Sequence, residues 1–99
     1  MSEPEISRNN IVCWSREAVA TEVNGEVILM HLERDRCHGL GSTGSAIWRR
    51  LREPVRVADL MMQLEAEFEA TPGKIESDVL RTLGEYAAEG LIQVRAARE

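Results

Sequence analysis

The sequence is poor in the residues that cross-link or kink a polypeptide. Only two cysteines and three prolines occur among 99 residues, and no apolar run approaches the roughly 20 residues of a membrane span. Two cysteines are too few for the disulfide framework of a small secreted domain, so we expect reduced thiols and a cytoplasmic protein. The first ten residues are polar and acidic, which fits neither a signal peptide nor a basic transit peptide. We expect no membrane partner.

Positive charge is also scarce. Lys and Arg number 12 against 17 Asp and Glu, which gives a net charge of −5. Binding to nucleic acid depends on Lys and Arg that neutralise phosphates, so this balance argues against a nucleic-acid partner. With 43% hydrophobic and 29% charged residues, the composition is that of one folded globular domain. We expect that domain over residues 11–95, with frayed tails at 1–10 and 96–99.

The first half of the chain has the pattern of β-strands. Asn24-Gly25 separates the segments 19–23 and 26–32, and this dipeptide favours a two-residue type I′ turn because both residues accept positive φ. Segment 26–32 is apolar on both faces, which predicts a central strand with other elements packed on each side. A short polar strand over 36–40 is the expected edge of this antiparallel sheet.

The second half has the pattern of helices. Three are predicted over residues 43–52, 57–69 and 72–89, because apolar residues recur at helical spacing and Pro54 ends the first helix. Gly90 follows the third helix, where a left-handed backbone is favoured. Residues 91–94 are expected to leave as a short extended tail. Strands followed by three short helices predict an α+β fold, winged helix-turn-helix-like, with one three-stranded antiparallel sheet.

Gly39, Gly41 and Gly44 have the G-x-G-x-x-G spacing of a dinucleotide-binding loop. The surroundings do not fit that interpretation. The residues before the glycines are polar instead of a buried apolar strand, and the helices that follow leave nothing to complete a parallel sheet. We therefore expect the glycines to let the chain leave an edge strand and enter a helix capped by Ser42 or Thr43.

Cys37 and His38 are adjacent and suggest a nucleophile with its base. Adjacent residues of a strand point to opposite faces, so these two side chains cannot hydrogen-bond to each other. Together with Cys13 and His31 they also lack the paired spacing that positions zinc ligands. We expect neither an enzyme nor a bound metal or other cofactor.

The third predicted helix is a poor recognition helix for DNA, because it carries Lys74 and Arg81 against four acidic residues. The strand over 36–40 offers a different surface. An edge strand exposes backbone N–H and C=O groups, to which an extended peptide can add a strand of its own. From geometry alone, an edge that merely resists aggregation is the more ordinary interpretation.

An ordered set of short motifs resembles the PqqD-like family of recognition elements, which bind the leader peptides of ribosomally made, post-translationally modified peptides (RiPPs). The set spans about residues 19–94 and consists of Gly39-Leu40, Thr43-Gly44, Ile47-Trp48, Leu51, Val57, Leu60, Leu64, Leu80, Leu83 and Gly90-Leu91-Ile92. The family often has aromatic residues where Cys37 and His38 stand, and Asn where Gly41 stands.

The resemblance implies a non-enzymatic protein that binds a leader by strand addition to its third strand, in a cleft shared with the third helix. Carried over to this chain, the peptide-binding residues are Arg36, Cys37, His38, Gly39, Leu40, Asp78, Thr82, Glu85 and Tyr86. A chain of this length looks most similar to the separate recognition proteins of lasso-peptide biosynthesis, whose partners include a leader peptidase (a transglutaminase-like cysteine protease). The alternatives are a PqqD-type chaperone that presents a peptide to a radical SAM enzyme and, in another class, a small winged-helix transcriptional regulator.

Overall fold

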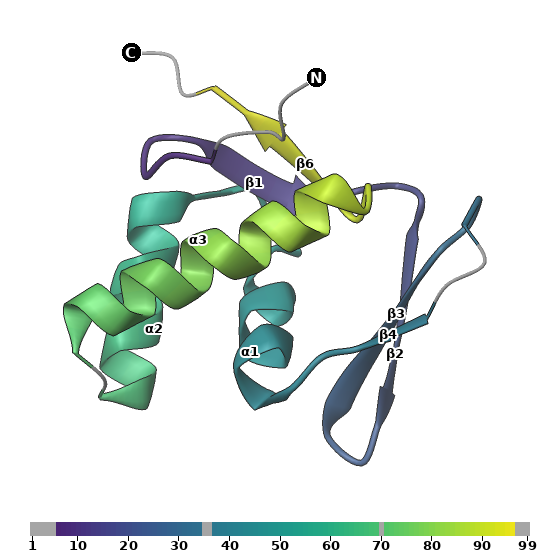
Figure 1. Ribbon diagram of the computed structural model, residues 1–99, viewed down its shortest axis with the longest axis horizontal. Coiled ribbons are helices and arrows are strands. Elements are labelled where there is room, and N and C mark those ends of the chain that lie inside the picture. The colour runs from purple at the N-terminus through teal and green to yellow at the C-terminus, as the bar shows by residue number, and fades with distance from the viewer. Residues whose placement is uncertain (1–5, 35–36, 70, 97–99) are drawn as a thin grey trace.

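The computed structural model describes residues 6–34, 37–69 and 71–96, with the backbone alone for Pro72. In chain order the elements are β1 (Ile11–Trp14), β2 (Ala18–Val23), β3 (Glu26–His31), β4 (Cys37–Gly39), α1 (Ser42–Arg50), β5 (Val55–Arg56), α2 (Val57–Phe68), α3 (Pro72–Ala88) and β6 (Ile92–Arg95). The strands form two three-stranded antiparallel sheets, in the orders β5-β1-β6 and β2-β3-β4. Figure 1 shows β2, β3 and β4 on one side of the three helices and β1 and β6 along another. The predicted α+β class is confirmed.

The β2–β3 hairpin turns at Asn24 and Gly25, as the sequence predicts. Their φ angles are 54° and 81°, which is the positive pair that a type I′ turn requires. The two-residue turn sets Val23 opposite Glu26 and fixes the register of the whole hairpin. On the other side of β3, β4 pairs antiparallel, and among the described strands none pairs with the second edge of β4.

Strand β3 is central, but other elements cover only one of its faces. Val27 and Leu29 are buried on the face toward the helices. On the opposite face Met30 is 43% exposed, and its neighbour Val19 on β2 is 45% exposed. The prediction that β3 is packed on both faces is therefore wrong. The helices lie against the inner face, and the second sheet packs elsewhere.

The three helices match their predicted ranges to within two residues at either end. The start of α1 differs in its capping: Gly41 is the N-cap residue, in extended conformation, with no side-chain hydrogen bond. The expected cap at Ser42 or Thr43 is wrong because both residues already lie inside the helix. Gly90 has φ 74°, which confirms the left-handed end of α3.

The sheet of β5, β1 and β6 was missed by the sequence analysis, which predicted only an extended tail after α3. Strand β6 pairs along the whole of β1, with Trp14 opposite Ile92 and Val12 opposite Val94. Residues 8–10 extend this end of the molecule, because the carbonyls of Arg8 and Asn10 accept hydrogen bonds from the first turn of α2. Those backbone acceptors take the role of the side-chain cap that α2 lacks.

The buried side chains form one core that includes residues of all three helices and both sheets. Its members include Val12, Val27, Leu29, Ile47, Leu51, Val57, Leu60, Leu64, Val79, Leu83 and Leu91. Trp14 stacks on Trp48 with ring centroids 5.1 Å apart, and Trp48 meets Tyr86 edge-on at 5.9 Å. This row of aromatic rings joins β1 through α1 to α3. Among the described helices, none combines the length and the apolar composition that a bilayer crossing requires.

Candidate functional site

A surface groove lies between β4 and α3. It consists of three adjoining cavities of about 610, 330 and 160 Å³. Glu85 lines all three cavities, and each cavity also reaches the strand side: His38 lines the first and third, and Gly39 and Leu40 line the second and third. The groove therefore follows the free edge of β4, where an extended chain has both backbone groups and side chains to contact.

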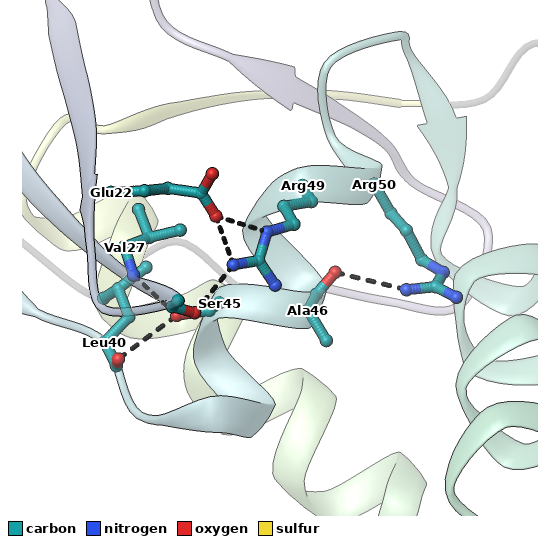
Figure 2. Close-up of polar contacts among 8 residues, drawn as sticks. Glu22, Val27, Leu40, Ser45, Ala46, Arg49 and Arg50 are labelled. Atoms are coloured by element: carbon teal, nitrogen blue, oxygen red, sulfur yellow. Dashed lines mark hydrogen bonds and ion pairs between the residues drawn. The ribbon is translucent and has the colours of Figure 1, made fainter.

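The strand side of the groove is held by Ser45, which is fully buried in α1. Leu40 donates its N–H directly to the Val27 carbonyl at 2.9 Å. The other two backbone groups of this pair, the Val27 N–H and the Leu40 carbonyl, are connected through Ser45. The Val27 N–H donates to Ser45 Oγ at 3.0 Å, and Ser45 Oγ donates to the Leu40 carbonyl at 3.2 Å (Figure 2). The hydroxyl thus keeps the end of β4 attached to β3 at the point where the chain turns toward α1.

Tyr86 forms part of the helix side of the groove and ties α3 to α1. Its hydroxyl donates to the Gly44 carbonyl at 3.0 Å. A Cβ at Gly44 would lie 3.1 Å from that hydroxyl and 3.3 Å from Leu40 Cβ, so this close approach depends on glycine. Burial, and secondly the charge of Glu85, raise the pKa of Tyr86 well above its ordinary value. The Tyr86 phenol therefore stays protonated at neutral pH and remains a hydrogen-bond donor.

Charged side chains line the groove along α3. Asp78 pairs with two cations, Lys74 at 3.1 Å and Arg81 at 3.4 Å. Beyond the C-terminal end of α3, Glu89 lies 3.4 Å from His38 Nε2, which joins the helix to β4. Glu85 stands between these two groups and is exposed; it has no ion-pair partner among the described residues.

The structure brings most of the predicted peptide-binding residues around this groove. The ones that line it are His38, Gly39, Leu40, Asp78, Thr82, Glu85 and Tyr86. Cys37 is exposed and lines none of the three cavities, as expected for a side chain on the opposite face from His38. Arg36 lies outside the described residues. Tyr86 was expected on the exposed flank of the helix, but only 5% of it is exposed, so it belongs to the inner wall.

Three charged residues of the groove were missed: Lys74, Arg81 and Glu89. Their signal was present in the sequence, since they lie three or four residues from Asp78 and Glu85 and so share a helical face with them. Within the described part of the chain, no three His, Cys, Asp or Glu side chains are grouped as metal ligands. The residues that line the groove offer backbone, aliphatic and charged contacts.

Comparison with protein-family models identifies one family. Residues 26–92 match the family model of coenzyme PQQ synthesis protein D (PqqD). The structure of TbiB1 in complex with the TbiA(beta) leader peptide has a TM-score of 0.75 and 28% identity, covering 82% of this chain and 94% of that one. The solution structure of the PqqD truncation of Methylobacterium extorquens PqqCD, a stand-alone RiPP recognition element, has a TM-score of 0.72 and 19% identity, covering 89% and 94%. A search of curated proteins found no significant match. The chain belongs to the PqqD family and has the fold of a RiPP recognition element.

Proposed function

We propose that this protein binds the leader region of a ribosomal precursor peptide by taking it up as an additional strand on β4. The observation that carries the proposal is an edge of β4 that no described strand pairs with, beside a groove that α3 closes on its far side. The bound leader of TbiB1, which has a similar fold at 28% sequence identity, supports a peptide as the ligand. No step of this function requires catalysis.

The hydrogen bonding of β4 indicates which backbone groups receive the leader. Hydrogen-bonded and non-bonded pairs alternate along an antiparallel ladder. Leu40, which follows β4, is bonded to Val27, so Gly39, the residue before it and the last of β4, directs its N–H and C=O away from β3. Gly39 is therefore the central backbone contact for an added strand. Side chains of the leader that point inward then meet His38, Leu40 and the face of α3.

Paired substitutions at Gly39 test this function. A Cβ at Gly39 has no heavy atom nearer than Ile28 Cδ1 at 3.6 Å, so Gly39→Ala fits and keeps the N–H, whereas Gly39→Pro removes it. Peptides selected from a displayed random library on the wild-type protein serve as ligands. We expect Gly39→Ala to bind them within a few-fold and Gly39→Pro to lose at least about tenfold in affinity.

Circular dichroism shows whether both Gly39 variants are folded, and Leu40→Asp provides a second disruption of the same strand. Leu40 is buried and lines the groove, so the charge is expected to abolish binding. Equal affinity of folded Gly39→Pro and Gly39→Ala for every selected peptide would place the peptide site elsewhere on the protein.

We further propose that the pathway is lasso-peptide biosynthesis and that the protein delivers the leader to a leader peptidase. The support is the resemblance of this chain, in length and motifs, to the separate recognition proteins of such pathways. The match to the PqqD family model favours a second candidate, presentation of a peptide to a radical SAM enzyme. The two candidate pathways are separated by measuring leader cleavage by a transglutaminase-like cysteine protease with and without this protein. Acceleration supports delivery to a peptidase, and an unchanged rate opposes it.

A further inference from the structure

Glu85 lies in the middle of the groove and carries a charge that no described residue neutralises. Among the residues that the structure describes, it alone lines all three cavities, and its carboxylate has no ion-pair partner there. Arg81 stands four residues before it, at a spacing that permits a pair on a helix, but Arg81 contacts Asp78 at 3.4 Å. The middle of the groove therefore keeps an unneutralised negative charge.

The two ends of the groove differ from its middle. At one end Asp78 shares Lys74 and Arg81, which leaves a surplus of positive charge. At the other end, His38 lies 3.4 Å and Arg34 lies 3.9 Å from Glu89. The strand opposite Glu85 contributes His38, which lies beside Glu89, and the uncharged Gly39 and Leu40. An incoming peptide thus meets one unbalanced carboxylate near the centre.

The field of Glu85 already acts on its surroundings. It adds to burial in raising the pKa of the neighbouring Tyr86 phenol. A peptide lying in the groove removes water from this carboxylate, and a charge that loses water without gaining a partner is costly. An acidic or neutral peptide side chain at this position leaves that cost unmet, whereas a Lys or Arg offsets it.

We infer that Glu85 is a specificity-determining residue that selects peptides with a Lys or Arg at the position facing the middle of the groove. The inference rests on the proposed leader binding at β4 and names the chemistry of its ligand. Successive residues of an added strand face opposite sides, so the basic residue belongs to the alternate set that points toward α3. For a partly exposed pair, neutralising Glu85 changes affinity by about fivefold, and added salt reduces the difference.

The experiment compares peptides selected from one displayed random library on three proteins: the wild type, Glu85→Lys and Glu65→Lys. Glu65 is a half-buried residue of α2 that lines none of the three cavities, so Glu65→Lys makes the same change in net charge away from the groove. We expect Lys or Arg to be enriched at one position on the wild type and on Glu65→Lys. On Glu85→Lys that position should favour Asp or Glu.

Affinities of the selected peptides for Gly39→Pro and Gly39→Ala then establish that they bind at β4. Enrichment of the same residues on the wild type and on Glu85→Lys overturns the charge selection and leaves the proposed function standing. A shift on Glu65→Lys equal to that on Glu85→Lys overturns it as well, because net charge alone then explains the preference. Failure to enrich any peptide on the wild type overturns the proposed function and this inference together.

Discussion

Replacing Ser45 by alanine tests how the strand edge of the groove is held in place. The hydroxyl is fully buried and joins the Val27 N–H, at 3.0 Å, to the Leu40 carbonyl, at 3.2 Å. Alanine fills nearly the same space, so the substitution removes two hydrogen bonds with little change in packing. The backbone groups of Val27 and Leu40 are then left inside the protein without this partner.

The expected loss follows from those two groups. A buried backbone donor or acceptor without a partner costs about 1–3 kcal/mol, so two of them cost at most about 6 kcal/mol. Val27 and Leu40 already share one direct bond, and a small inward movement of β4 restores part of the second. We therefore expect Ser45→Ala to lower the free energy of unfolding by about 2–4 kcal/mol, a large part of the stability of a domain this size.

Equilibrium unfolding in urea, followed by circular dichroism, measures this loss. Ser42→Ala is the matched control, because Ser42 is exposed at the start of the same helix and makes no capping hydrogen bond. We expect the control to change the free energy of unfolding by less than about 0.5 kcal/mol. A loss below about 1 kcal/mol for Ser45→Ala would refute the reasoning, since the bridge would then contribute no more than an ordinary surface contact.

Two further predictions concern the helix that closes the groove. Gly90→Ala places a methyl group 3.1 Å from His31 Nε2 at φ 74°, so we expect urea unfolding to show a loss of about 2–3 kcal/mol. Gly25→Ala is its control: φ is 81° there but no atom lies within 4 Å, so a loss equal to that of Gly90→Ala would exclude the His31 contact as a cause. Tyr86 is the single tyrosine, so ultraviolet absorbance follows its ionisation alone. Burial and Glu85 raise its pKa in the folded state, so the stability that the neutral phenol contributes is present below the ordinary pKa of about 10 and is lost as the pH rises further. We expect tyrosinate to appear together with the loss of circular dichroism, and ionisation near pH 10 in a fully folded protein contradicts this.

Local chemistry decided the features that the sequence predicted best. Asn24-Gly25 favours one turn type, and that turn alone sets the register of β2 and β3. Gly90 marks the end of α3 for the same reason, because left-handed backbone at a helix end favours glycine. The edge position of β4 followed from its polar residues and short length. Gly39 and Glu85 were predicted as peptide contacts from the family resemblance and not from local chemistry.

Features that depend on distant parts of the chain were not predictable in this way. Strand β1 is four residues long and pairs with β6, and neither segment carries a signal that names its partner. Ser45 lies among apolar residues of α1, where its spacing alone does not distinguish a bridge to β3 from an ordinary helical position. The outer face of β3 is apolar but exposed. Apolar residues on both faces of a strand therefore do not establish that another helix or sheet packs on each face.

The pairing of β1 with β6 has a consequence for how the chain folds during synthesis. Of the described elements, β1 is the first strand to be synthesised, but its partner β6 follows all three helices. Contacts between segments so far apart in sequence form slowly, because most of the chain must be ordered before they close. A nascent chain that ends before β6 has no strand to set beside Trp14 and Cys13. Completion of this sheet therefore waits until β6 has left the ribosome.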